Sequence, residues 1–181
     1  MLEAIVYSLT SIKEVKGIVI YVEGELLTVL PKSKTNLPTI LDRNIGINKV
    51  YNIDSIDNIT KTTIYYLSKN NDNYYYVPVT KYINNDKLDK IKIIIEELTS
   101  NPVYESNLMS FLNVNTKLFD YEIKDDVIKL NFNNLILSDI TGNSILEEVI
   151  YTISLSVSNE IDVKEVIFMV ENEEIYKKVL E

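Results

Sequence analysis

The segment LEEVIYTISLSVSNEIDVKEVIFMV, residues 146–170, decides the fold because the chain contains a second copy of it. The earlier copy, LEAIVYSLTSIKEVKGIVIYV, occupies residues 2–22. Each copy joins a helix-like half to a strand-like half, and VKGIVIYVEGE matches VKEVIFMVENE at five of eleven positions. The join has four residues (11–14) in the first copy and eight (155–162) in the second. A repeat of this kind predicts two related structural units.

The repeat also predicts how the chain is divided. Because the first copy begins at Met1, we expect residues 1–41 to be the C-terminal part of a truncated first unit. Residues 42–60 mix isolated isoleucines with Asn and Asp, which is typical of an ordered linker. Residues 61–181 then form a complete second unit. The elements expected in the first unit are a helix over 2–11, a strand over 15–23, a turn at Gly24 and a return strand over 26–30.

The second unit combines helical and strand patterns. In chain order we expect a strand hairpin (62–68 and 74–83), a helix capped by Asp86 (87–99) and one or two helical turns (107–112). We then expect a hairpin (117–133) and a helix opened by the capping box Ser144–Glu147. A central strand (163–170) and a short strand or helical turn (171–181) complete the unit. Pro78 within the second strand predicts an edge strand or a bulge. This order predicts an α+β fold, a two-layer α/β sandwich whose mixed sheet carries helices on one face.

The composition excludes several kinds of function. A net charge of −9, with Arg43 as the single arginine, argues against nucleic-acid binding. The chain has no cysteine and no histidine, so the commonest general base, thiolate chemistry and the usual zinc ligands are absent. There is no phosphate-binding glycine loop and no run of ~20 apolar residues that would span a membrane. We therefore expect no catalysis, no cofactor and no metal.

Two groups of carboxylates are better explained by turns than by a site. Asp125 and Asp126 lie where the hairpin over 117–133 should turn, a position that favours Asp for backbone reasons. The acidic run Glu171–Glu174 matches Glu23–Glu25 in the first copy. The same turn is therefore predicted to occur in both units.

Tyrosines and an apolar strand are the candidate interaction residues. The set comprises Tyr65, Tyr66, Tyr74, Tyr75 and Tyr76 of the first hairpin, with Ile18, Ile20 and Val22 of the first unit. The tyrosines could form a surface for a glycan, a peptide or a partner protein, or half of them could belong to the core while the rest pack across strands. The three aliphatic residues belong to a strand with an unpaired edge, which predicts self-association of the chain.

Several segments resemble one family. The run LEEVIYTISLSVSNEIDVKEVIFMVENEE, preceded by VIKLNFNN, resembles the closing half of a GerMN domain, and DKIKIIIEELTSNP resembles an earlier helix of that domain. LEAIVYSLTSIKEVKGIVIYVEGELLTVLP is similar to the end of a preceding GerMN copy. The resemblance covers almost the whole chain. It implies a non-catalytic envelope protein of sporulation and germination that is anchored outside the cytoplasmic membrane, with the anchor outside this sequence, and that contacts protein partners in a transenvelope complex.

These observations leave functions of three classes. The first is a scaffold that assembles envelope proteins, and the second is a module that binds cell-wall glycan or peptide through the tyrosine hairpin. The third, an enzyme, has no visible catalytic constellation. A deep pocket lined by tyrosines and carboxylates would favour the second function, whereas a flat apolar strip beside a strand edge would favour the first.

Overall fold

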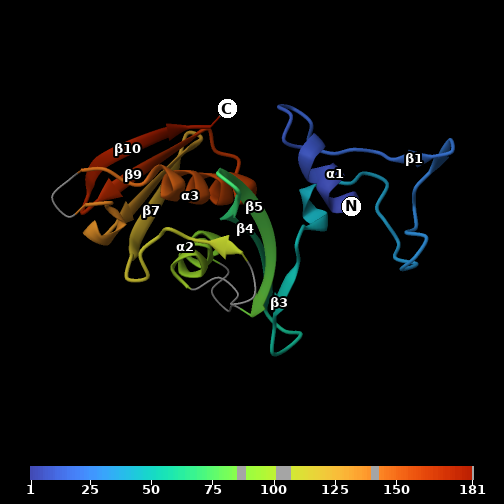
Figure 1. Cartoon of the computed structure of the whole chain (residues 1–181), viewed down its shortest axis with the longest axis horizontal. Helices are drawn as coiled ribbons and strands as arrows, with labels where there is room; N and C mark the ends of the chain where they lie inside the picture. The colour runs from blue at the N-terminus through green and yellow to red at the C-terminus, as the bar shows by residue number, and fades with distance from the viewer. Residues whose placement is uncertain (85–88, 101–106, 140–142, 181) are drawn as a thin grey trace. The chain divides into compact units, whose positions relative to one another are not determined.

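The computed structural model describes residues 1–84, 89–100, 107–139 and 143–180. The chain divides into two compact units, Met1–Asn48 and Lys49–Glu181 (Figure 1). No described helix has the length and apolar character needed to cross a membrane.

The second unit contains two four-stranded mixed sheets. The first sheet has the order β3 (Val50–Asn52), β5 (Asn73–Asn84), β4 (Ile59–Asn70), β6 (Leu108–Met109). The second has the order β10 (Glu173–Val179), β9 (Glu165–Val170), β8 (Val127–Phe132), β7 (Leu118–Lys124). One neighbouring pair in each sheet is parallel, β3 with β5 and β8 with β9, and the other pairs are antiparallel.

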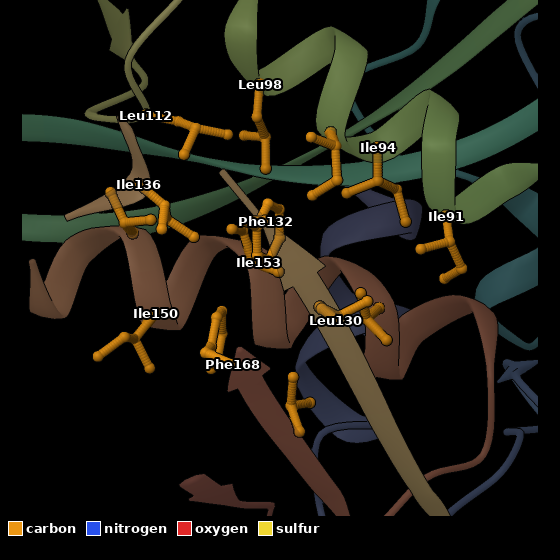
Figure 2. Packing of buried hydrophobic residues seen from close by; sticks show 14 of the residues in the cluster. Ile91, Ile94, Leu98, Leu112, Leu130, Phe132, Ile136, Ile150, Ile153 and Phe168 are labelled. Atoms are coloured by element: carbon orange, nitrogen blue, oxygen red, sulfur yellow. The ribbon is translucent and has the colours of Figure 1, made fainter. Parts of the chain in front are cut away.

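Two helices and both sheets share one hydrophobic core. The helices α2 (Lys90–Thr99) and α3 (Glu147–Glu160) both contact β4 and each other. Their isoleucines and leucines meet the inward side chains of β8 and β9 (Figure 2). The side chains that Figure 2 labels in this core are Ile91, Ile94, Leu98, Leu112, Leu130, Phe132, Ile136, Ile150, Ile153 and Phe168. A shared core of this size is what makes the second unit a domain.

The first unit has far less regular structure. It contains α1 (Leu2–Leu9), β1 (Tyr21–Val22), β2 (Glu25–Leu26) and a 3-10 turn, η1 (Arg43–Ile45). Its buried hydrophobic side chains are Val6, Tyr7, Leu41 and Ile47. Many other large apolar side chains in this unit are exposed.

The structure confirms the α+β class and the mixed strand pairing. It distributes the strands over two sheets, a division that the sequence does not predict. The central position of β9 is confirmed, because it lies between β8 and β10. The hairpin of β7 and β8 is also confirmed, with Asp125 and Asp126 at its turn, both at positive φ. The final segment is a strand, β10, and the stretch 42–60 contributes β3 to a sheet.

Three local predictions are wrong. The strand over 15–23 is reduced to β1 and an isolated bridge between Ile18 and Leu41, because β1 pairs only with the short β2 in this unit. The stretch 107–112 contains the strand β6 rather than helical turns, because Leu108 and Met109 pair with the edge of β4. The capping box does not form, since α3 begins after Leu146 with no side-chain cap. Asp86, expected to cap α2, lies outside the described residues; Asp89 caps this helix instead.

Candidate interaction surface

The five hairpin tyrosines have different environments. Tyr65 and Tyr66 are buried, at 8% and 1% exposure, so they cannot contribute to an exposed surface as the sequence suggested. Tyr74 and Tyr75 are about half exposed, and Tyr76 is half-buried. Successive side chains of a strand point to opposite faces, so Tyr74 and Tyr76 lie on one face of β5 and Tyr75 on the other.

Tyr76 joins a cluster that the sequence did not predict. Its ring stacks on Tyr151 of α3, with ring centroids 5.5 Å apart. The ammonium group of Lys178 on β10 lies 4.0 Å from the centroid of the Tyr151 ring. Burial raises the pKa of Tyr76, and the carboxylates of Glu148 and Glu147 raise it further. We call Tyr76, Tyr151, Lys178, Glu147 and Glu148 the tyrosine cluster; it presents aromatic, cationic and anionic groups together.

A shallow hollow adjoins this cluster. It is lined by Asn143, Ser144, Ile145, Glu147, Ile150, Ile175 and Tyr176. Glu147 belongs to both the hollow and the cluster. Aromatic and apolar surface with a few polar groups is the usual lining of ligand sites.

A buried ion pair lies within the second unit. Lys81 of β5 donates a hydrogen bond to the Glu97 carboxylate of α2, and its ammonium group lies 5.4 Å from the Tyr66 ring centroid. Burial alone would lower the pKa of Lys81, but the hydrogen bond to Glu97 and the contact with Tyr66 raise it above its ordinary value. Burial is the largest influence on the pKa of Tyr66 and raises it. This geometry keeps Lys81 charged, which suits a structural cation.

The apolar candidates of the first unit lie at its surface or close to it. Ile18 and Ile20 are half-buried, and Val22 is 52% exposed. Ile18 exchanges two backbone hydrogen bonds with Leu41, each 2.8 Å long. This pairing is short, although the apolar sequence of the segment is typical of a longer strand.

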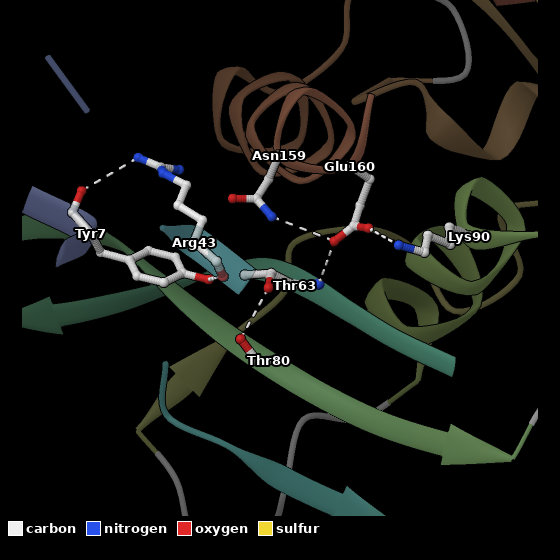
Figure 3. A network of polar contacts seen from close by, with 7 residues as sticks. All are labelled: Tyr7, Arg43, Thr63, Thr80, Lys90, Asn159 and Glu160. Carbon is white, nitrogen blue, oxygen red and sulfur yellow. Dashed lines mark hydrogen bonds and ion pairs between the residues drawn. The ribbon is translucent and has the colours of Figure 1, made fainter. Parts of the chain in front are cut away.

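The only arginine of the chain organises the first unit. Arg43 donates through Nε to Thr10 Oγ1 at 3.1 Å and through an Nη atom to the backbone oxygen of Tyr7 at 3.4 Å. Its guanidinium carbon lies 5.1 Å from the centroid of the Tyr7 ring, and Tyr7 donates its hydroxyl hydrogen to the backbone oxygen of Arg43 (Figure 3). Tyr7 and Tyr151 occupy matching positions in the repeat, and in each unit a cation from outside the repeated segment lies over this tyrosine.

Among the described residues, no group of acidic side chains converges as a metal site would. The repeated helix–strand–hairpin segment and the α+β second unit define a protein built from tandem related domains. The Germane family, described as "Sporulation and spore germination", matches residues 63–176, and the chain belongs to this family.

The chain is also similar to a curated relative and to a solved structure. It is 32% identical over 172 residues to the "Spore germination protein GerM" of Bacillus subtilis (strain 168), covering 92% of this chain and 46% of that protein. The chain thus spans about half the length of this relative. It also matches the structure titled "Tandem GerMN domains of the sporulation protein GerM from Bacillus subtilis", with a TM-score of 0.84 and 31% identity over 95% of this chain and 60% of that one.

Proposed function

We propose that the chain is a non-catalytic assembly module of the cell envelope that acts in sporulation and spore germination through protein–protein contacts. The observation that carries the proposal is the similarity to the tandem GerMN domains of GerM, which extends over 95% of the chain and therefore over both units. The absence of histidine and cysteine agrees with a role that needs no chemistry.

The proposed place of action is the cell envelope, outside the cytoplasmic membrane. The proposed partners are proteins of the complex that crosses the envelope during sporulation. Exposed apolar residues of the first unit support contact with proteins, because Ile12, Tyr21, Val22 and Ile40 are each more than half exposed.

The test uses the intact protein in its own host. Deleting the gene should lower the yield of heat-resistant spores, and the wild-type gene should restore it. Cross-linking in sporulating cells should capture envelope proteins that growing cells do not yield. An unchanged spore yield together with unchanged cross-linked partners would refute the role.

A second candidate function is binding of cell-wall glycan or peptide. The observation that favours it is the stack of Tyr76 on Tyr151, with the ammonium group of Lys178 over the Tyr151 ring. Retention of the protein on purified cell-wall sacculi should then fall in Tyr151→Ala. The matched control is Tyr21→Ala, because Tyr21 is a 65% exposed tyrosine outside the cluster. Equal retention of both variants and the wild type would exclude this function.

A further inference from the structure

The connection between β3 and β4 exposes several large apolar side chains. Figure 1 shows this connection extending past the end of β3. Residues 51–59 are all exposed to solvent, and we call them the isoleucine loop. Single exposed apolar residues are ordinary, whereas several in one short segment mark a surface for contact with another molecule. The loop has four such side chains, with their exposed fractions: Tyr51 (61%), Ile53 (37%), Ile56 (89%) and Ile59 (39%).

Ile56 is the one residue of the bend that does not favour a turn. The bend over 54–58 reads DSIDN. Asp, Ser and Asn favour turns because their side chains bond to nearby backbone groups, and Asn58 has a positive φ of 54°, which asparagine tolerates. Isoleucine has neither property, and at 89% exposure Ile56 adds little buried area to the fold. Local structure therefore gives no reason for an isoleucine at the tip of this loop.

The side chain of Asn84, at the end of β5, holds the loop in one conformation. Its Oδ1 accepts hydrogen bonds from the backbone N–H groups of Asp54 and Ser55, at 2.7 and 3.3 Å. Its Nδ2 donates to the backbone oxygens of Ser55 and Asp57, at 3.0 and 2.6 Å. The strand register brings this amide to the loop, because Asn84 pairs with Ile59 at the start of β4. Polar bonds therefore order the loop, and its isoleucines remain at the surface.

The base of the isoleucine loop is also held in place. The ring of Tyr51 on β3 stacks on the ring of Tyr82 on β5, with centroids 4.7 Å apart and planes at 13°. The two residues are partners in the parallel pairing of these strands. A surface that is ordered before binding loses little conformational entropy when a partner arrives. The isoleucine loop is thus preorganised for contact.

The charge of the loop indicates what kind of partner fits it. Residues 50–60 contain two aspartates and neither lysine nor arginine. Asp54 and Asp57 lie within two residues of Ile56, so negative charge borders the apolar tip. An anionic membrane surface would repel these carboxylates, and a second copy of the chain carries the same net charge of −9. The complementary surface is a basic one on a different protein.

We propose that the isoleucine loop is a docking surface for an envelope protein that presents an apolar pocket bordered by lysine or arginine side chains. Ile56 is the anchor that enters the pocket, and Asp54 and Asp57 face the cations. A desolvated anchor of this kind carries much of the binding free energy of an interface. The proposal deepens the assembly role proposed above and rests on it, and it places this contact on the second unit.

The test places a photo-cross-linker beside the anchor in the intact protein of the sporulating host. p-Benzoylphenylalanine replaces Tyr51, and irradiation should join the protein to a different protein. Ile56→Ser should lower the yield of this product about tenfold or more, and so should the charge reversal Asp54→Lys/Asp57→Lys. The matched control is Val114→Ser, which should leave the yield unchanged, because Val114 is a 63% exposed β-branched residue in another loop of the second unit.

Each alternative occupant gives a different result. A product made of two copies of the chain would assign the loop to self-association. Flotation of the chain with vesicles of 70% phosphatidylcholine and 30% phosphatidylglycerol, abolished by Ile56→Ser, would assign it to a membrane. Either result overturns the proposal, as does a product whose yield Ile56→Ser or the charge reversal leaves unchanged. If no product forms while deletion of the gene still lowers spore yield, the docking surface fails and the assembly role stands.

A second variant tests the preorganisation of the loop without removing the anchor or its charges. Asn84→Ala removes the bonds that order the loop, so backbone hydrogen exchange at Asp54 and Ser55 should become faster. The yield of the cross-linked product should fall about threefold, because binding must then order the loop. Faster exchange with an unchanged yield would overturn the proposal that a preorganised loop docks the partner.

Discussion

The two copies of the repeated segment have the same turn and different surroundings. In the first copy Glu23 and Gly24 connect β1 to β2, and in the second Glu171 and Asn172 connect β9 to β10. All four residues have positive φ, as two-residue hairpin turns of type I′ require. However, β1 has two residues and β9 has six. Local sequence therefore sets the turn, whereas neighbouring strands decide how far the hairpin extends.

The helices differ for a related reason. α1 has 8 residues and α3 has 14, and the longer join of the second copy forms the last turns of α3. Those turns carry Ser156 and Glu160, which cover the β4 edge. The additional residues thus extend the helix over a strand that the first unit does not contain.

The largest expected difference in unfolding free energy between the copies is at one matching position of the two helices. Ile153 of α3 is fully buried, whereas the matching Leu9 of α1 is 41% exposed. Ile153→Asp buries an unpaired carboxylate and removes core packing, so it should cost about 5 kcal/mol of unfolding free energy. Leu9→Asp should cost about 1 kcal/mol or less. Urea unfolding followed by far-ultraviolet circular dichroism measures both. Similar losses in the two variants would mean that the helices are equally buried.

A smaller loss is expected from the ion pair of the second unit. Lys81→Ala leaves the Glu97 carboxylate without its cation in a mostly buried site, which should cost about 3 kcal/mol. Lys92→Ala on the same helix as Glu97 is the control, because Lys92 is half exposed and pairs with Asp89 at 3.5 Å. Its loss should stay below about 1 kcal/mol. If both lysines gave the same small loss, the Lys81 site would be hydrated.

The same ion pair should make the second unit sensitive to alkali. The pKa of Lys81 is raised above 10.5 and that of Tyr66 above 10.0 in the folded chain. Both groups therefore hold protons that the unfolded chain releases, so stability is complete below pH 10 and falls as the pH rises further. NMR signals of the second unit should weaken first above pH 10; simultaneous loss of both units would contradict this order.

Much of the second unit could be predicted because its patterns are local. The β4–β5 hairpin, the β7–β8 hairpin and the central β9 follow from alternation and turn residues. The sequence did not predict that the strands form two sheets, because strand pairing across the chain is not a local property. The prediction of helix at Leu108 and Met109 was wrong, because these residues form a strand only through pairing with the edge of β4.

The candidate site could be predicted only in part. The hairpin tyrosines drew attention to Tyr76, but Tyr151 and Lys178 come from α3 and β10, and no spacing in the sequence relates them. Burial of Tyr66 follows from the face of β4 that meets the core, which could not be assigned without the helices. The one missed signal was Thr152, Ser156 and Glu160, a polar stripe at four-residue spacing on an otherwise apolar helix face.

Removal of the cation over Tyr7 and of the cation over Tyr151 should lower the unfolding free energy by unequal amounts. Arg43→Met removes two hydrogen bonds to the last turn of α1 together with the contact with the Tyr7 ring, so it should cost about 1–2 kcal/mol. Lys178→Met removes the contact with the Tyr151 ring and should cost about 0.5–1 kcal/mol. Residue-level hydrogen exchange places each loss in its own unit. A larger loss for Lys178→Met would mean that the tyrosine cluster, rather than Arg43, carries the greater share of stability.

The smallest expected effect tests whether the two turns are the same local structure. Glu23 and Glu171 both have positive φ, at 54° and 51°, which glutamate adopts less readily than asparagine. Asparagine at the first position of a type I′ turn is strongly preferred, so Glu23→Asn and Glu171→Asn should each stabilise the chain by about 0.5 kcal/mol. The matched control is Glu25→Asn, since Glu25 lies in β2, where asparagine is depleted. Thermal unfolding should shift upward for the two turn variants and downward or not at all for the control. If only Glu171→Asn were stabilising, the turn of the first copy would depend on its surroundings, and the rule that local sequence sets both turns would fail.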